Sequence, residues 1–349
     1  MEIIRGITAA IHERKSIFEA IELIENIGIG LVAIINHNKK LVGVLADADV
    51  RKAILKGMNK EESVNNIMNI NFVSAKVGIN DMALENLMKE SGRNQIPIIN
   101  KNGILFDVIA KSDFSEKIYD NPVIILAGGL GKRLRPLTND NPKPMLEIGG
   151  KPILEIAVEN LIKSGFYKIV LAINYKGHMI EEYFGNGKNW GCEITYIREK
   201  KKLGTSGALS LLPINLDKPF FIMNADLLTK VNFSHILDYH LEHNTIATVC
   251  VSQYDLEVPY GVVRTDSHGL ISVNEKPVQS FFVNAGIYIA EPEILHFVPK
   301  NKKIDMTDLL NIILEKGHKI SVFPIREYWL DVGRTEDLMQ ANKDYKDYF

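Results

Sequence analysis

Three glycines and two basic residues follow a short apolar run, and their spacing suits phosphate binding. The glycines come directly after the uninterrupted apolar residues 123–126 and are Gly128, Gly129 and Gly131. Glycine lets a backbone turn sharply and brings bare N–H groups close to an anion. Arg133 and Lys143 come next, and each can neutralise phosphate charge, the first as a planar fork and the second as a point charge. The stretch predicts a phosphate-binding loop; the alternative is an ordinary turn beside two solvated basic residues.

Two aspartates are candidates for holding a metal ion beside such phosphates. Asp226 follows an apolar segment that begins at Pro219, and Asp331 follows the segment that begins at Trp329. Mg²⁺ prefers one or two protein carboxylates and takes its other oxygen ligands from phosphates and water. A single aspartate in such a place is explained equally well as the cap of a turn. Because there are two of them, each in a similar place after a predicted strand, we predict that Asp226 and Asp331 form a metal-binding pair.

The elements around these residues alternate between strands and helices. Apolar runs predict strands at residues 123–126, 168–173, 193–198 and 219–224, and helical periodicity predicts helices at 153–163, 179–184, 306–316 and 335–345. This alternation indicates an α/β fold with a mostly parallel, Rossmann-like sheet covered by helices. In such a sheet ligands gather beyond the carboxyl ends of the strands. The glycines and Asp226 are expected at that edge.

The first third of the chain repeats one pattern of helix, strand, turn and strand. The pattern occurs at residues 16–45 and again at residues 81–109, and Asp49 and Asp113 follow it at matching places. One repeat is too small to bury a core of its own, so we expect the two to pack together. A short turn at residues 119–122 separates the repeats from the rest. The predicted domains are residues 1–118, a smaller α/β unit, and residues 122–349.

Composition excludes several classes of protein. The chain has 349 residues, and its 41 Lys and Arg against 43 Asp and Glu give a net charge of −2. Without a basic excess, no nucleic-acid partner is expected. Cys192 and Cys250 show no metal-binding spacing, no apolar run approaches the length of a membrane span, and the N-terminus lacks the pattern of a signal peptide. The expectation is a soluble cytoplasmic protein with no membrane partner.

The ordered motifs between residues 121 and 148 resemble the signature of the sugar-1-phosphate nucleotidyltransferases, also called nucleotide-sugar pyrophosphorylases. The glycine turn is followed by Arg-Leu-Arg-Pro-Leu-Thr and then by Pro-Lys-Pro. A P-loop is excluded, because Arg133 stands where that motif needs Ser or Thr. Lys132 stands where the family more often has Thr. The resemblance implies that Asp226 and Asp331 share a catalytic Mg²⁺. The implied nucleotide-binding residues are Leu126, Ala127, Gly128, Gly129, Gly131, Glu199, Gly204 and Thr205.

The same resemblance implies a sugar-phosphate pocket built from three motifs, Tyr260-Gly-Val-Val, Glu275-Lys-Pro and Asn284-Ala-Gly. In the family pattern Gly261 lets the backbone approach the sugar, Glu275 and Asn284 bind its hydroxyls, and Lys276 binds its phosphate. The implied catalytic residues are Arg133, Lys143 and Lys276. The implied reaction joins a sugar 1-phosphate to the nucleotidyl group of a nucleoside triphosphate and releases pyrophosphate.

The first third resembles a pair of CBS domains, which commonly bind adenine nucleotides between their halves. The stretch Gly-Val-Leu-Ala-Asp-Ala-Asp-Val-Arg-Lys from Gly43 carries the resemblance, and residues 98–113 echo it. It implies that Asp49 and Asp113 contact the ribose of a regulatory nucleotide; helix capping is their alternative role. Ala46 and Ala110 stand where nucleotide-binding members have Ser or Thr. We expect weak nucleotide binding or none, and a homodimer formed largely through this module.

A CBS pair ahead of such a transferase resembles the guanylyltransferases that activate glucosamine 1-phosphate for bacterial legionaminic-acid synthesis. The expected substrates are therefore GTP and glucosamine 1-phosphate, for a bacterial surface glycan or nonulosonic acid. The alternatives are a mannose- or heptose-1-phosphate guanylyltransferase and an enzyme that uses another nucleoside triphosphate. An alternative of another class is a non-catalytic nucleotide sensor. A sensor predicts losses among the phosphate and metal groups, whereas this chain keeps all of them, namely Arg133, Lys143, Asp226, Lys276 and Asp331.

Overall fold

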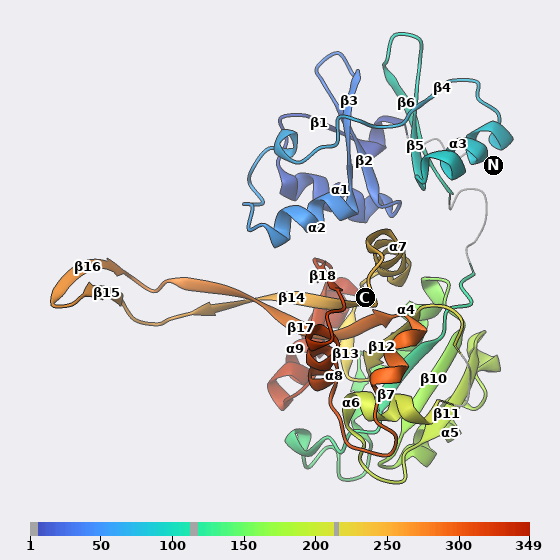
Figure 1. Ribbon diagram of the computed structural model, residues 1–349, viewed down its shortest axis with the longest axis vertical. Helices are drawn as coiled ribbons and strands as arrows, with labels where there is room; N and C mark the ends of the chain where they lie inside the picture. The colour runs from blue at the N-terminus through green and yellow to red at the C-terminus, as the bar shows by residue number, and fades with distance from the viewer. Residues whose placement is uncertain (1–5, 112–117, 213–215) are drawn as a thin grey trace. The chain divides into compact units, whose positions relative to one another are not determined.

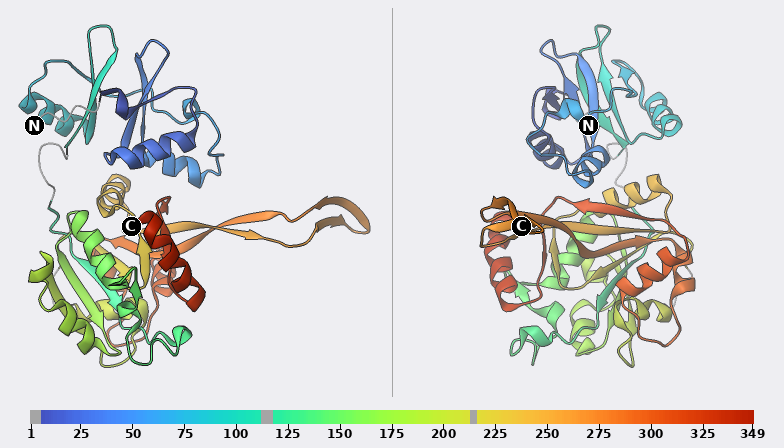
Figure 2. Two further views of the ribbon diagram at one scale, coloured as in Figure 1. Left: turned by 180° about the vertical axis from the view of Figure 1, so that it is seen from behind. Right: turned by 60° about the vertical axis from the view of Figure 1, so that its left-hand side comes forward.

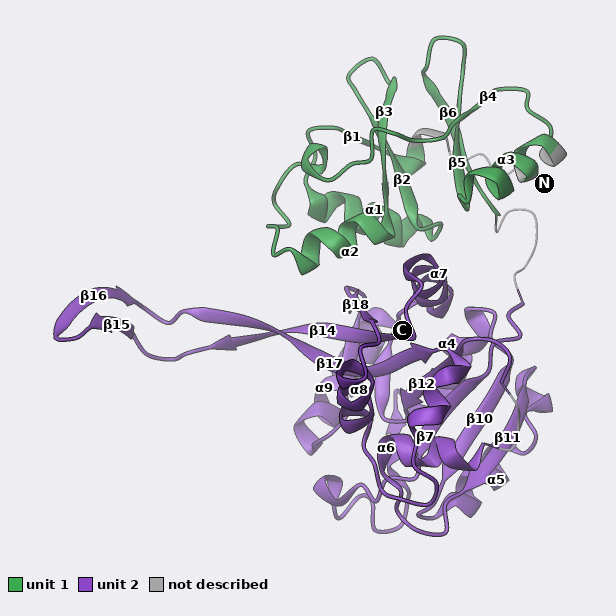
Figure 3. Cartoon of the chain, viewed as in Figure 1, with its two compact units in different colours: residues 1–117 green, residues 118–349 purple. Residues whose placement is uncertain are grey.

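The computed structural model describes residues 6–111, 118–212 and 216–349 of the chain. Its residues divide between two units, 1–117 and 118–349 (Figure 3). The predicted domain limits, 118 and 122, lie beside this division. Among the described residues, no helix combines the length and the apolar character that crossing a membrane requires.

The first unit holds two three-stranded sheets built in the same way. In each, the first strand is parallel to the second and the third is antiparallel to it. The strands are β1 (Ala10–His12), β2 (Leu31–Ile35), β3 (Leu41–Ala46), β4 (Ala75–Lys76), β5 (Gln95–Ile99) and β6 (Leu105–Ala110). The helices are α1 (Ile17–Ile27), α2 (Asp47–Leu55) and α3 (Asp81–Ser91). This confirms the internal repeat, although Asp113 lies outside the described residues.

The two repeats share part of one hydrophobic core. Ala33 and Ile35 of β2 belong to the same buried cluster as Leu105 and Val108 of β6. A three-stranded sheet with one helix buries too little apolar surface to be stable alone. The shared cluster confirms that the two repeats pack together as one unit.

Local sequence sets where α1 begins and ends. The Ser16 hydroxyl accepts the backbone N–H of Glu19 at 3.2 Å, and the Glu19 carboxylate accepts the backbone N–H of Ser16 at 2.9 Å. This capping box satisfies two N–H groups that the first turn of a helix leaves free. Gly28 ends the helix with φ of 72°, a left-handed conformation that glycine adopts without steric cost.

The second unit is built on a seven-stranded sheet in the order β11-β10-β7-β12-β17-β14-β18 (Figure 1). Only β17 is antiparallel to its neighbours. The strands are β7 (Val123–Ala127), β10 (Lys168–Ile173), β11 (Glu193–Arg198), β12 (Phe220–Asn224), β14 (Ala247–Glu257), β17 (Val278–Ala290) and β18 (Ile320–Ile325). The predicted α/β fold with a mostly parallel sheet is confirmed.

Helices and short strand pairs surround this sheet. The helices are α4 (Ile153–Lys163), α5 (Gly177–Phe184), α6 (Gly204–Gly207), α7 (Phe233–His243), α8 (Met306–Glu315) and α9 (Thr335–Tyr348). The two-stranded pairs are β8 (Glu147–Ile148) with β9 (Lys151–Pro152), β13 (Leu227–Thr229) with β19 (Trp329–Asp331), and β15 (Val262–Asp266) with β16 (Gly269–Asn274). Because both faces of the sheet are covered, the central strand β7 is an unbroken apolar run, and Val123, Ile124 and Ile125 are fully buried.

Strands β14 and β17 extend far beyond the body of the second unit. Their outer parts form a two-stranded ribbon that carries β15 and β16 at its end (Figures 1 and 2). We call residues 252–283 the arm. Every residue of β15 and β16 is exposed or only partly buried.

Candidate active site

The predicted phosphate loop lies directly after β7, at the carboxyl end of the central strand. A Cβ atom on Gly131, whose φ is 58°, would lie 2.7 Å from Cγ2 of Thr138, and one on Gly128 would lie 3.0 Å from Oε1 of Glu199. The Thr138 hydroxyl donates a hydrogen bond of 2.8 Å to the carbonyl of Gly131. Larger side chains at Gly128 and Gly131 would therefore collide with these neighbours, whereas Gly129 has open space beside it.

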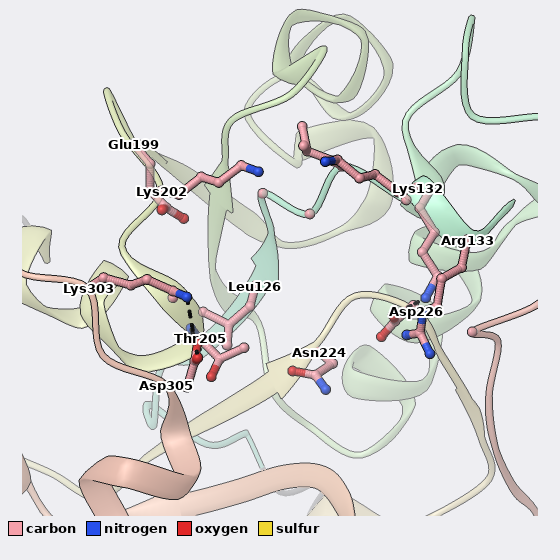
Figure 4. Close-up of a pocket in the computed structure, with 17 residues that line it drawn as sticks. Leu126, Lys132, Arg133, Glu199, Lys202, Thr205, Asn224, Asp226, Lys303 and Asp305 are labelled. Atoms are coloured by element: carbon pink, nitrogen blue, oxygen red, sulfur yellow. Dashed lines mark hydrogen bonds and ion pairs between the residues drawn. The ribbon is translucent and has the colours of Figure 1, made fainter. Parts of the chain in front are cut away.

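The loop forms one wall of a pocket of about 520 Å³ (Figure 4). Ten residues predicted to bind or act on the nucleotide line it, namely Leu126, Gly128, Gly129, Gly131, Arg133, Lys143, Glu199, Gly204, Thr205 and Asp226. Seven further lining residues were not among the predicted site residues and are Leu130, Lys132, Lys202, Asn224, Lys303, Asp305 and Gly333, whereas the predicted Ala127 and Asp331 are not among the lining residues. Pockets of this size suit a small-molecule ligand such as a nucleotide.

Two short 3₁₀ turns present the predicted cations to the pocket. Arg133 lies in η4 (Lys132–Leu134) and Lys143 in η5 (Lys143–Met145). The guanidinium of Arg133 lies 3.4 Å from the place where Gly333 would carry a Cβ atom, so the absence of a side chain there makes room for it. Lys143 is buried, and its ammonium forms an ion pair with the Asp226 carboxylate.

The two aspartates come together because of the pairing of β13 with β19. Asp226 precedes β13, and Asp331, the last residue of β19, is paired with Leu227. Asp331 thus ends a strand of this small sheet, not one of the main sheet. Its Oδ1 lies 3.9 Å from Nζ of Lys143, which also pairs with Asp226. Burial and then the negative charge of Asp226 raise the pKa of Asp331 above its ordinary value, against the opposing effects of Lys143 and Arg133.

The carboxylate pair fits a divalent cation that also binds phosphate. Oδ1 of Asp226 and Oδ1 of Asp331 are buried and accept no hydrogen bond from any residue that the structure describes. Across residues 6–111, 118–212 and 216–349, no cluster of three or more His, Cys, Asp and Glu side chains is placed to hold a metal. Two free carboxylate oxygens suit Mg²⁺, which takes its remaining ligands from phosphates and water.

Glu199 and Gly204 lie on the opposite side of the pocket. Oε2 of Glu199 accepts the backbone N–H of Leu203 at 3.2 Å, and burial raises the pKa of this carboxyl. Gly204 has φ of 81°, and a Cβ atom there would lie 2.4 Å from the carbonyl oxygen of Ile304. Only glycine fits this close approach between two segments of backbone.

The segment before α8 completes this side of the pocket. The Asp305 carboxylate accepts the backbone N–H of Thr205 at 3.1 Å, and the Thr205 hydroxyl accepts the backbone N–H of Met306 at 2.7 Å. The hydroxyl of Thr205, a predicted nucleotide-binding residue, is therefore engaged in holding the start of α8. Lys303 and Asp305 lie about 100 positions further along the chain, which is why the nearby motifs did not indicate them.

The sequence that forms this fold matches known families. The family model described as "Nucleotidyl transferase" matches residues 122–348, and the model of the CBS domain matches residues 7–56. The chain belongs to the nucleotidyl transferase family. Its catalytic unit is preceded by a CBS domain.

Curated relatives and solved structures agree with this assignment. The chain is 34% identical over 227 residues to a mannose-1-phosphate guanyltransferase of Candida albicans, covering 62% of each chain, and 36% identical over 226 residues to one of Schizosaccharomyces pombe, also covering 62% of each. The chain thus spans less than two thirds of the length of these relatives. The crystal structure of HddC from Yersinia pseudotuberculosis is 27% identical with a TM-score of 0.51, covering 64% of this chain and 99% of HddC. A further structure of HddC, complexed with GMP-PN, is 26% identical at the same TM-score and coverage.

Three residues predicted for the sugar-phosphate pocket of this nucleotidyl transferase lie on the arm. Gly261, Glu275 and Lys276 are exposed and do not line the pocket. Glu275 and Gly261 do lie together, because a Cβ atom on Gly261 would be 3.0 Å from Oε2 of Glu275. Lys276 adjoins them in a left-handed conformation, with φ of 44°. The structure keeps these three residues in one cluster but separates the cluster from the nucleotide pocket of the same chain.

Asn284, the fourth predicted sugar residue, lies at the base of the arm beside the pocket. Its amide nitrogen donates to the Tyr288 hydroxyl at 2.7 Å, and its amide oxygen accepts the backbone N–H of Gly286 at 3.0 Å. A Cβ atom on Gly286 would lie 2.5 Å from the side chain of Asn224, which lines the pocket. The region of Asn284 therefore packs directly behind the pocket wall.

In the CBS unit, Asp49 supports the first turn of α2. Its Oδ2 accepts the backbone N–H of Ala46 at 3.2 Å, and Ala46, not Asp49, is the N-cap residue. Burial raises the pKa of the Asp49 carboxyl. One oxygen of the Asp49 carboxylate therefore accepts a hydrogen bond at the start of α2.

Proposed function

We propose that this chain transfers a nucleotidyl group from a nucleoside triphosphate to a sugar 1-phosphate and releases pyrophosphate. The observation that carries the proposal is the meeting, in one pocket, of a glycine loop, two cations and the Asp226 carboxylate, with the Asp331 carboxylate 3.9 Å from the same Lys143 ammonium. Phosphoryl-type transfer needs this combination, because positioning and charge neutralisation supply most of the catalysis. The similarity to guanyltransferases of mannose 1-phosphate supports the same reaction class.

In the proposed reaction a phosphate oxygen of the sugar 1-phosphate attacks the α-phosphorus of the triphosphate in line. The new P–O bond forms as the bond to the β-phosphate bridging oxygen breaks, and its electron pair leaves with pyrophosphate. The loop N–H groups after β7 hold the phosphates, and Arg133 and Lys143 stabilise the charge that develops on the leaving group. Lys276 orients the attacking phosphate. No residue of the chain becomes covalently modified.

Asp226 and Asp331 are the residues that would hold Mg²⁺ in this pocket. When bound, Mg²⁺ supplies positive charge to the phosphate oxygens around the reacting phosphorus. The adjacent Lys143 ammonium balances the two carboxylates from the protein side.

The direct test is release of pyrophosphate. The purified full chain is expected to release it only when a nucleoside triphosphate, a sugar 1-phosphate and Mg²⁺ are all present. Chelation of the metal or omission of either substrate should reduce release to background. Absence of activity with the common triphosphates, each combined with hexose and hexosamine 1-phosphates, would leave the non-catalytic sensor as the better account.

We further propose GTP as the nucleotide. Oε1 of Glu199 faces the glycine loop, and the part of the chain described here offers it no hydrogen-bond donor. Guanine presents adjacent N1–H and N2–H donors, whereas uracil and thymine present a single N–H between two carbonyl oxygens. A site built to accept hydrogen bonds rejects bases whose acceptors it would face. The guanyltransferases among the relatives and the HddC complex with GMP-PN point the same way.

The sugar is proposed to be glucosamine 1-phosphate, with mannose 1-phosphate as the second candidate. The CBS unit ahead of the transferase favours the first, and the curated relatives favour the second. The ratio of kcat/KM values for the two sugars, measured with one nucleotide, decides between them.

Glu199→Gln is expected to weaken the preference for GTP. The amide keeps the size of the side chain but offers one acceptor in place of two, so we expect kcat/KM for GTP to fall about tenfold, equivalent to one charged hydrogen bond. The values for UTP and dTTP should change little. The control is Glu193→Gln, which changes an exposed glutamate of β11 outside the pocket. An equal loss with all triphosphates would assign Glu199 to loop structure instead of base selection.

The CBS unit is proposed to bind adenine nucleotides weakly and to contribute to a homodimer. Asp49 already accepts one backbone N–H, and Ala46 offers no hydroxyl. Each missing hydrogen bond costs about 0.5–1.5 kcal/mol, so binding is weakened without being abolished. Calorimetry of the full chain with AMP should show a weak exotherm that Asp49→Ala removes. Tight binding, or binding that Asp49→Ala leaves unchanged, would contradict this assignment.

A further inference from the structure

The arm separates residues that a single sugar site would have to bring together. Asn284 lies six positions after Val278, the first residue of β17, which is roughly 20 Å of extended chain at about 3.3 Å per residue. Glu275 and Lys276 lie between the end of β16 at Asn274 and the start of β17 at Val278, further out along the arm. These residues therefore cannot contact a sugar bound beside Asn284 of the same chain.

The arm is a continuation of two strands of the main sheet, so it is joined to the body by paired strands instead of a flexible loop. The pairing of β14 with β17 runs without a shift from Val251 opposite Asn284 to Glu257 opposite Val278. Folding the arm back over its own pocket would break this ladder. A continuous ladder instead directs the arm away from the body, as Figures 1 and 2 show from different sides.

The surface of the arm requires a partner. It carries ten exposed large hydrophobic side chains, among them Tyr254, Leu256, Tyr260, Leu270, Phe281 and Phe282. Tyr254 is paired with Phe281 across the ribbon, and Val263 with Val273, so apolar side chains lie side by side. A two-stranded ribbon is at best marginally stable in water, and apolar patches of this kind mark interaction surfaces.

We propose that the arm crosses to a second copy of this chain and completes that copy's active site. The cluster of Gly261, Glu275 and Lys276 would supply the sugar-phosphate contacts that the partner's nucleotide pocket lacks. A second copy is the occupant that the observations favour, because its pocket lacks the residues that the arm carries. Exchange of two identical arms about a twofold axis satisfies both pockets and closes the assembly. This inference rests on the proposed function and deepens it.

The principal test is complementation between two inactive variants. One chain carries Asp226→Asn, which disables the pocket, and the other carries Lys276→Ala, which disables the arm. The two are co-expressed with different tags, and mixed dimers are isolated by sequential purification. Each mixed dimer then holds one intact composite site, so about half of the wild-type turnover per dimer is expected, whereas either variant alone is inactive.

A matched control pairs two variants of the same pocket. Mixed dimers of Asp226→Asn with Asp331→Asn contain no intact pocket, whichever chain supplies the arm, and should stay inactive. Restored turnover in the first mixture and not in the second supports exchange of arms. If the wild-type protein is active and both mixtures remain inactive, the arm acts within its own chain and the proposal is overturned.

A second test needs no catalysis and therefore separates this inference from the proposed function. Tyr260→Cys places a thiol on the arm, and Lys132→Cys places one at the pocket; the native Cys192 and Cys250 are buried. A bifunctional thiol reagent should link the two single variants to each other when they are mixed and allowed to exchange subunits. Absence of any link between the two chains would overturn the proposal. If the wild-type protein proves inactive with every substrate, the proposed function fails while this result still decides the placement of the arm.

Discussion

Asp226→Asn is expected to lower kcat about a thousandfold, since the change removes a charged group that acts on the transition state through the bound metal. The amide is nearly the same size as the carboxylate but is a poor ligand for Mg²⁺. It also removes the nearer of the two carboxylate charges that pair with the Lys143 ammonium. Turnover measured across a range of Mg²⁺ concentrations is the test, and the loss should persist at a saturating concentration of the nucleoside triphosphate.

The control for this variant is Asp120→Asn. Asp120 is an exposed carboxylate that pairs with Lys168 at 3.0 Å and Lys218 at 3.3 Å, outside the pocket. The same chemical change there should leave kcat unaltered. Near-wild-type turnover of Asp226→Asn at limiting Mg²⁺ would remove Asp226 from the proposed metal pair.

The pH dependence of Asp226→Asn activity gives a prediction with a defined direction. Asp331 must be ionised to hold a cation, so activity is lost as the pH falls through its pKa. That pKa is raised first by burial and second by the charge of Asp226. Because Asp226→Asn removes the second cause, the acid limb of its residual activity should move to lower pH. An unchanged acid limb would show that a group other than Asp331 controls the loss of activity at low pH.

Most of the fold could be predicted from the sequence because its signals are local. The apolar run that forms β7 and the helical spacing that forms α4 each lie within about a dozen residues. The glycine loop, Arg133 and Lys143 are also contained in one segment, and the structure brings them to one pocket wall.

The parts of the site and fold that could not be predicted depend on pairings between distant parts of the chain. Asp305 enters the pocket because it accepts the N–H of Thr205, a contact across 100 positions. Asp331 was expected to follow a strand, whereas the pairing of β19 with β13 places it at the end of one. The direction of the arm follows from the unbroken ladder of β14 and β17, which no local pattern reveals. The family resemblance therefore implied one sugar-phosphate pocket for Glu275, Lys276 and Asn284, although the structure keeps Asn284 of one chain apart from the other two.

Lys143→Met is expected to lower kcat about a hundredfold or more, which is the scale for removing one preorganised group that stabilises developing charge. Met keeps the unbranched shape of the buried side chain without its charge. Lys143→Arg is the matched control, because it keeps the charge but replaces a point charge with a planar fork. It should lose less activity than Lys143→Met.

The pH profile of Lys143→Met should shift in the direction opposite to that of Asp226→Asn. The Lys143 ammonium lies 3.9 Å from Asp331 and lowers the pKa that burial and Asp226 raise. Without this cation the pKa of Asp331 rises further, so the acid limb should move to higher pH, while Lys143→Arg should stay close to the wild type. Excess Mg²⁺ should stabilise Lys143→Met against thermal unfolding more than the wild type, because the ion then replaces the positive charge that Lys143 supplied to the two carboxylates. A limb that moves to lower pH, or equal stabilisation of both proteins by Mg²⁺, would contradict the role of Lys143 in balancing this carboxylate pair.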